Sequence, residues 1–166
     1  MDSDPSKIEA WLSPVLPVYE PGLDAVVNEV RGKNLIFSYD LPTAVKDSQM
    51  IFISVNTPTK VNGVYEGRAP DLTNLEAVTR LIAKHALNSK IVVEKSTVPV
   101  RSAQSIANIL RENSNGIRHQ VLSNPEFLSE GNAVRDLVSR TPAQSTLTLS
   151  TDEPGPRPDR RGRGDG

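Results

Sequence analysis

The sequence predicts an α/β protein in which a parallel sheet carries helices on its faces. Three short apolar runs, at 50–55, 91–93 and 120–123, alternate with longer segments whose apolar residues recur at helical spacing. Runs that are apolar almost throughout are typical of strands buried on both faces of a parallel sheet. Each run ends in a polar turn, and such sheets bind ligands at the carboxyl ends of their strands. We therefore expect a binding site along that edge.

Composition and charge limit the classes of function. The chain has 166 residues, enough for one domain with a buried core, and a formal net charge of −1, which gives no reason to expect a nucleic-acid or membrane partner. It has no cysteine, which excludes disulfides, cysteine metal sites and a thiol nucleophile within these residues. No apolar stretch approaches the roughly 20 residues needed to span a bilayer, and no signal-peptide pattern is present. We expect a soluble, cytoplasmic domain without a metal.

The N-terminal residues predict two short helices. Asp4 can cap the first helix, which begins at Pro5 and ends before Pro14. Its inward face is expected to hold Ile8, Trp11 and Leu12. After a proline-rich loop, the second helix is expected over 23–30, and Gly32 ends it in the left-handed conformation.

Two further elements are expected between this helix pair and the strand at 50–55. The apolar run at 35–37 predicts an earlier strand, and residues 41–46 predict a short helix. Asp71 is placed to cap a long helix, whose inward residues recur at helical spacing: Leu72, Leu75, Val78, Ile82 and Ala86. Pro99 opens another helix over 100–111. Its inward residues are Ile106, Ile109 and Leu110.

Three polar turns are expected to converge at one edge of the sheet. They are Asn56 to Thr59, Ser96 with Thr97, and Asn124 to Glu126. Loops use these residue types without any ligand, but three such turns on one side favour a binding edge. Glu126 follows a proline-fixed turn, so it is a candidate general base or ligand acceptor, with helix capping as the alternative. Lys95 either binds a phosphate or forms an ion pair, and His85 and His119 are interpreted as surface residues.

Composition changes after residue 138. Residues 139–166 contain four prolines, four glycines and five arginines, and only three aliphatic residues: Ala143, Leu147 and Leu149. So few apolar groups cannot offset the entropy of ordering, which predicts a disordered tail. An RNA-contacting role for its Arg-Arg-Gly-Arg-Gly stretch is the weaker alternative.

Four motifs together resemble the UDP-glucose 6-dehydrogenase branch of the nucleotide-sugar dehydrogenase family. They are Tyr-Glu-Pro-Gly-Leu at 19–23, Val-Asn-Thr-Pro-Thr at 55–59, Glu-Lys-Ser-Thr-Val-Pro at 94–99 and Asn-Pro-Glu-Phe-Leu-Ser-Glu-Gly at 124–131. The resemblance implies oxidation of UDP-glucose to UDP-glucuronate by two NAD, through a cysteine-bound intermediate. Alternatives are a related dehydrogenase of GDP-mannose or UDP-N-acetylmannosamine, or a non-catalytic subunit that joins and modulates full-length enzyme.

The resemblance also implies roles for individual residues. Thr97 and Glu126 resemble the catalytic pair that positions water and assists thioester hydrolysis. The implied cofactor site consists of Asp2, Lys7, Val55, Asn56, Thr57, Pro58, Thr59, Ser96 and Glu130. In it, Asp2 resembles the acid that holds the adenosine ribose, and Glu130 resembles the nicotinamide-side carboxylate. The implied substrate loop consists of Glu126, Phe127, Leu128, Ser129 and Glu130. Implied partners are UDP-glucose and full-length subunits in a homo-oligomer.

The resemblance turns the predicted fold into an incomplete Rossmann-like sheet, with a partial NAD-binding domain at 1–138 and an unrelated tail at 139–166. The family begins with a strand, a glycine-rich turn, a helix and a second strand that ends in the acid matched by Asp2. We expect these first two strands, and the family's later cysteine-bearing domain, to be missing. The expected consequences are an inactive chain, an exposed apolar strand edge and weak stability.

Overall fold

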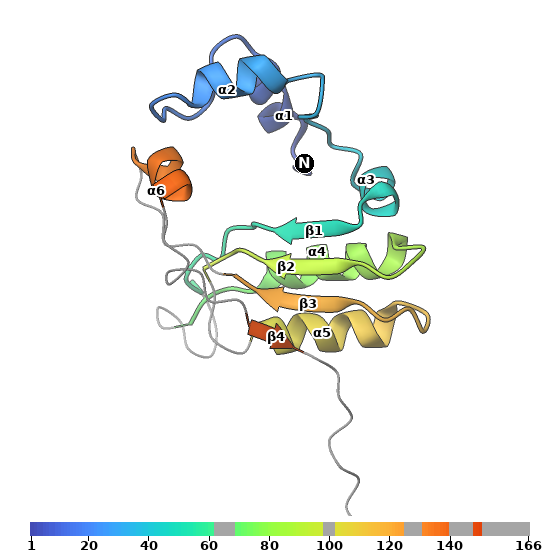
Figure 1. The fold of residues 1–166 in the computed structure, drawn as a ribbon. Coiled ribbons are helices and arrows are strands. Elements are labelled where there is room, and N and C mark those ends of the chain that lie inside the picture. The colour runs from blue at the N-terminus through green and yellow to red at the C-terminus, as the bar shows by residue number, and fades with distance from the viewer. Residues whose placement is uncertain (62–68, 98–101, 125–130, 140–147, 151–166) are drawn as a thin grey trace, which may run out of the picture.

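The computed structural model describes residues 1–61, 69–97, 102–124, 131–139 and 148–150 (Figure 1). A four-stranded sheet lies at its centre, in the order β1 (Met50–Ile53), β2 (Ile91–Glu94), β3 (Gln120–Ser123) and β4 (Thr148–Ser150). The first three strands are parallel, and β4 runs antiparallel to β3. The predicted parallel sheet is therefore confirmed. Its register aligns Ile53, Glu94 and Ser123 at the carboxyl ends of the three parallel strands.

Two long helices, α4 (Thr73–His85) and α5 (Ser102–Asn113), cover one face of this sheet and lie behind it in Figure 1. Asp71 lies one residue before Leu72, the N-cap of α4, and its Oδ1 accepts from the Thr73 N–H, the first amide of the helix, at 2.9 Å. The core between the helices and the sheet consists of Val45, Ile53, Leu75, Ile82, Ala83, Ala86, Val92, Ile106, Ala107, Leu110 and Val121. The expected inward face of α4 is thus confirmed, with Leu72 and Val78 partly buried at its border. On α5, Ile106 and Leu110 are buried as expected, but Ile109 is only partly buried and lies outside this core.

The N-terminal residues form a separate helical layer, which lies beyond the β1 edge in Figure 1. Its helices are α1 (Pro5–Leu12) and α2 (Leu23–Val30), and Asp4 caps α1 as predicted. Trp11 stacks on Phe37 with ring centroids 5.3 Å apart. Arg31 adds hydrogen bonds to the carbonyls that end α1. Of the expected inward residues of α1, Ile8 is buried, but Leu12, in the last turn of the helix, is exposed.

Two expected strands differ from the prediction. Residues 35–37 form no strand; Leu35 makes only an isolated bridge to Arg31. A strand needs an adjacent strand for its hydrogen bonds, and Phe37 instead packs on Trp11. The helix α3 (Leu41–Asp47) then leads into β1, which ends at Ile53 rather than at residue 55.

The strand β1 is not buried on both faces, contrary to the expectation. Met50 and Phe52 are 47% and 57% exposed, whereas Ile53 is buried. Side chains alternate across a strand, and α4 and α5 cover only one of its two faces. Among the described residues β1 pairs with β2 alone, so the expected open strand edge is present.

The tail prediction needs one correction. Within 139–166, residues Thr148–Ser150 form β4, with Leu149 opposite Leu122 of β3. Pairing satisfies backbone groups that β3 would otherwise present at its open edge, which composition alone does not show. The rest of the expected tail from residue 140 onward, like the loop at 62–68, lies outside the described residues. The last helix is α6 (Ala133–Ser139). No helix in the described part of the chain is long and apolar enough to cross a membrane.

Candidate functional site

The turns that follow β1 and β2 are locked together by one serine. The Val55 N–H donates to Ser96 Oγ at 3.0 Å, and the same hydroxyl donates to the Val55 carbonyl at 2.9 Å. Thr57 Oγ1 adds a hydrogen bond to the Thr97 carbonyl at 2.9 Å. Ser96 is buried, and its hydroxyl braces the two turns against each other. The structure thus brings together Thr57, Ser96 and Thr97, which the sequence placed at one sheet edge.

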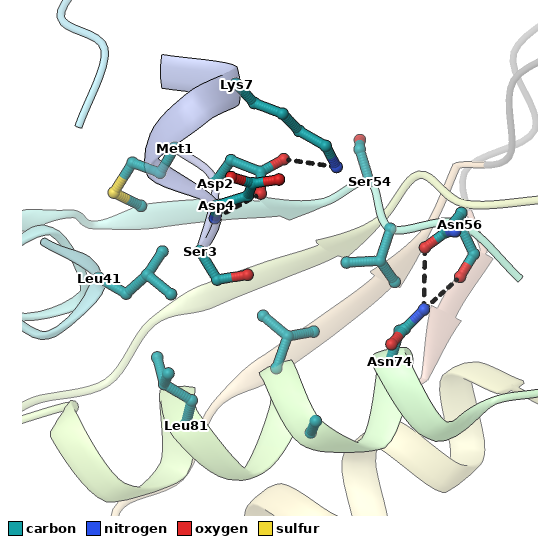
Figure 2. Close-up of a pocket in the computed structure, with 13 residues that line it drawn as sticks. Met1, Asp2, Ser3, Asp4, Lys7, Leu41, Ser54, Asn56, Asn74 and Leu81 are labelled. Atoms are coloured by element: carbon teal, nitrogen blue, oxygen red, sulfur yellow. Dashed lines mark hydrogen bonds and ion pairs between the residues drawn. The ribbon is translucent and has the colours of Figure 1, made fainter. Parts of the chain in front are cut away.

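The amide of Asn56 is held by α4. Asn74 Nδ2 donates to Asn56 Oδ1 at 2.8 Å and lies 3.3 Å from the Asn56 carbonyl (Figure 2). Further along, the Asp71 N–H donates to the Pro58 carbonyl, and Thr59 bridges to Pro70. The turn after β1 is therefore fixed along its length by the residues that begin α4.

Acidic side chains at the N-terminus face the turn after β1. Asp2 Oδ2 lies 3.5 Å from Lys7 Nζ, and Asp2 Oδ1 accepts from the Asp4 N–H at 3.0 Å. The Asp4 carboxylate receives hydrogen bonds from the Ser6 hydroxyl and then the Ser6 amide, which lower the pKa of Asp4. Asp4 is therefore anionic at neutral pH, and the Asp2–Lys7 pair is solvent-exposed, so it contributes little to stability.

A pocket of about 670 Å³ lies between the N-terminal layer and the sheet edge (Figure 2). It is lined by Met1, Asp2, Ser3, Asp4, Lys7, Leu41, Ser54, Val55, Asn56, Asn74, Ala77, Val78 and Leu81. The charged groups of α1 and its preceding residues form one side, and apolar side chains of α4 form the other. Its size is in the range usual for small-molecule sites.

Four of the cofactor residues implied by the sequence line this pocket: Asp2, Lys7, Val55 and Asn56. Thr57, Pro58, Thr59 and Ser96 support the turns but do not line it. Thr97 is exposed beyond the pocket, and only its carbonyl has a described role, as the acceptor for Thr57. Glu126, Phe127, Leu128, Ser129 and Glu130 lie outside the described residues.

Sequence reasoning missed several lining residues. Asn74 gave no signal, because a polar residue in the first turn of a helix is ordinary. Val78 was assigned to the core by its helical spacing, and Leu81 and Ala77 were not singled out. Leu41 is the first residue of α3, and its neighbours in the sequence give no sign that it lines a pocket. The fold brings α3, α4 and the N-terminal residues together around one pocket, and the local sequence does not show this.

The end of β2 contains a buried acid. Glu94 is 1% exposed, its Oε2 accepts from Ser123 Oγ at 3.1 Å, and its Oε1 has no hydrogen-bond partner among the described residues. Burial raises the pKa of the Glu94 carboxyl, and the bond from Ser123 only partly opposes this. The Glu94 carbonyl also accepts from the Asn124 N–H, so the chain leaving β3 is held at this point.

His119, at the opposite end of the sheet, does not lie fully on the surface as expected. His119 is partly buried; its Nδ1 accepts from the Lys90 N–H at 3.2 Å, and its Nε2 lies 3.0 Å from Ser114 Oγ. This cluster faces away from the pocket and joins the start of β2 to the end of α5. Within the described ranges, no three His, Asp or Glu side chains are grouped so that they could hold a metal ion.

The pocket chemistry suits a nucleoside. A carboxylate such as Asp2 can accept hydrogen bonds from the two hydroxyls of a ribose. Lys7 offers a positive charge, and the apolar side chains of α4 offer a surface for a flat ring. Amide groups held in place, as in Asn56, supply further polar contacts.

Comparison with known proteins agrees with this geometry. A family model described as the NAD binding domain of the UDP-glucose/GDP-mannose dehydrogenase family matches residues 1–143. UDP-glucose 6-dehydrogenase 2 of Arabidopsis thaliana is 54% identical over 139 residues, which make up 84% of this chain and 29% of that protein. The chain therefore spans less than a third of the length of this curated relative.

Two solved structures share the fold. A UDP-glucose dehydrogenase from the archaeon Pyrobaculum islandicum matches with a TM-score of 0.77 at 29% identity, over 89% of this chain and 34% of that one. A GDP-mannose dehydrogenase from Pseudomonas aeruginosa matches with a TM-score of 0.76 at 30% identity, over 90% of this chain and 34% of that one. These matches confirm the predicted Rossmann-like α/β class. The chain belongs to the UDP-glucose/GDP-mannose dehydrogenase family and carries the NAD-binding domain of that family.

Proposed function

We propose that the pocket binds the adenosine half of NAD, and that the chain serves the NAD-dependent oxidation of UDP-glucose to UDP-glucuronate. One observation supports NAD binding: the Asp2 carboxylate, Lys7 and the Asn56 turn line one pocket together with apolar side chains of α4. These are the groups that a ribose, a phosphate and an adenine ring require. When bound, NAD supplies the acceptor for the hydride that leaves the sugar.

Each of these pocket residues has its own proposed role in binding NAD. Asp2 accepts from the ribose hydroxyls, which fixes the orientation of the nucleoside. Lys7 is an exposed cation beside Asp2 and attracts the phosphate groups. Val78 and Leu81 pack against the ring, while Asn56, held by α4, presents its amide to the rest of the cofactor.

The substrate proposal is based on the relatives. Three curated relatives that are 54–55% identical to the chain are UDP-glucose 6-dehydrogenases. Thr97 and Glu126 are proposed as the catalytic residues of that reaction, with residues 126–130 as a substrate loop. Because the chain has no cysteine, we expect no turnover by these residues alone. A cytoplasmic location stays a prediction.

Isothermal titration of the purified chain with NAD and, separately, with UDP-glucose tests the proposal. We expect saturable NAD binding that weakens about tenfold or more in Asp2→Asn, because a hydrogen bond to a charged acceptor is worth about 1.5–3 kcal/mol. Glu112→Gln is the matched control, since Glu112 is an exposed carboxylate on α5, away from the pocket. Absence of NAD binding, or equal weakening by both variants, would contradict the proposed site.

A second candidate is a non-catalytic subunit that joins full-length enzyme. The open edge of β1, with Met50 and Phe52 exposed, favours it, because such an edge can pair with another strand. Co-expression with a full-length enzyme and purification through a tag on this chain tests it. Recovery of the chain free of the enzyme would remove this candidate.

A further inference from the structure

Glu20 joins two parts of the molecule that are far apart in sequence. Its Oε1 accepts from the Gly131 N–H at 2.7 Å, and its Oε2 accepts from the Ala133 N–H at 3.2 Å, across 111 and 113 residues. Both oxygens of the carboxylate are therefore used. The contact links the N-terminal helical layer to the start of α6, and Figure 1 shows α6 beside that layer and apart from the sheet.

A rigid turn presents Glu20. The Leu23 N–H donates to the Glu20 carbonyl at 3.1 Å, which closes a four-residue turn before α2. Pro21 occupies its second position, and Gly22 its third with φ +85° and ψ −9°. These are the features of a type II turn, in which the third position favours glycine because φ is positive. The Tyr-Glu-Pro-Gly-Leu motif therefore aims the carboxylate with little freedom of its backbone.

The backbone amides of Gly131 and Ala133 need an acceptor such as the Glu20 carboxylate. Amides at the start of a helix have no acceptor within the helix. The Glu20 carboxylate satisfies one of them, that of Ala133, together with the Gly131 amide two residues before the helix, by charge-assisted hydrogen bonds. Gly131 has a φ of +79°, so its backbone turns into α6 in a conformation that suits glycine.

The other end of the connection from β3 to α6 is also held. The Asn124 N–H donates to the Glu94 carbonyl at 2.9 Å, which ties the exit of β3 to the sheet. The sheet thus fixes Asn124, and the N-terminal layer fixes Gly131. We propose that Glu20 is a positioning residue: by holding the N-terminal layer to the start of α6, it fixes the place of that layer in the NAD pocket. This inference rests on the proposed function, because the same layer carries Asp2 and Lys7, the proposed cofactor contacts.

Three variants of the full chain test this role: Glu20→Ala, Glu20→Gln and the control Glu29→Ala. Glu29 is an exposed carboxylate of α2, in the same layer as Glu20. Amide hydrogen exchange of Gly131 and Ala133, measured by NMR, reports the anchor directly. NAD titration reports the positioning, and thermal unfolding shows that each variant is folded.

In Glu20→Ala we expect the two amides to exchange about tenfold faster or more, as loss of a hydrogen bond to a charged acceptor implies. NAD affinity should fall roughly threefold to tenfold, because binding must then fix an N-terminal layer that has lost this tie. Glu20→Gln keeps one acceptor oxygen and should recover part of both effects. Glu29→Ala should match the unmodified chain.

Unchanged exchange or unchanged NAD affinity in Glu20→Ala would overturn the role, as would equal losses in Glu29→Ala. If Glu20→Ala does not unfold cooperatively, Glu20→Gln decides, and failure of both to fold would overturn positioning in favour of a purely structural role. If the unmodified chain does not bind NAD, the proposed function fails. Faster exchange at Gly131 and Ala133 alone would then still support the anchor.

Discussion

The buried Glu94 gives the sharpest test of how the carboxyl edge of the sheet is stabilised. The residue is 1% exposed, and within the described part of the chain one oxygen of its carboxyl has no hydrogen-bond partner. Because burial raises its pKa in the folded state, the folded protein binds this proton more tightly than the unfolded chain does. The stability from Glu94 is therefore fully present below the unfolded pKa and is lost as pH rises through the folded pKa.

Glu94→Gln removes the charge and keeps the shape, with an oxygen that can still accept from Ser123. A buried polar group without a partner costs about 1–3 kcal/mol. At pH 8 we expect the free energy of unfolding of the variant to be higher by about 1–3 kcal/mol, which corresponds to roughly 2–12 °C in Tm for a chain of this size. At pH 4, where the carboxyl of the folded protein is protonated, the two proteins should differ little.

Urea unfolding at pH 4, 6 and 8 measures both terms of this prediction. Glu112→Gln on α5 is the control, because it removes an exposed carboxylate of the same type. The reasoning would be refuted if Glu94→Gln were less stable than the unmodified chain at pH 8. It would also be refuted if the difference between the two proteins did not grow with pH.

Two further predictions concern the brace and the distal histidine. Ser96→Ala should lower stability by about 1–3 kcal/mol and weaken NAD binding, because it leaves the Val55 amide without its acceptor; a change under about 0.5 kcal/mol in urea unfolding would contradict it. Burial and the charge of Lys90 lower the pKa of His119, so its contribution is present above the unfolded pKa and is lost as pH falls through the folded one. His119→Asn should flatten the fall in stability below about pH 6.5, and a flattening of equal size in His85→Asn would contradict the assignment.

The helices α1 to α5 were predictable because their signals are local, whereas no helix was expected where α6 forms. The Pro5 start of α1, the 23–30 helix and the apolar spacing of α4 each depend on a few neighbouring residues. Strands depend on partners that the local sequence does not show. The run at 35–37 is as apolar as a strand but pairs with none, whereas Thr148–Ser150 has an unpromising composition and pairs with β3.

The candidate site was predictable to the same extent. Motif positions gave Asp2, Lys7, Val55 and Asn56, which line one pocket. The partner that holds Asn56 could not be found, because Asn74 lies on a helix whose rotation relative to the turn is set by the packing of α4 on the sheet. Exposure of Phe52 was missed for a related reason: an apolar run does not tell which of its faces a helix will cover.

The pocket lies between two layers, and this placement decides which interactions control binding. The sheet and α4 supply the Asn56 turn and the apolar wall, while the N-terminal layer supplies Asp2 and Lys7. Bracing within the sheet, as by Ser96, therefore cannot by itself fix the distance across the pocket. Contacts that tie the N-terminal layer to later parts of the chain must contribute. The Glu20 bonds to the start of α6 provide such a tie, which gives the motif at 19–23 a physical role although none of its residues lines the pocket.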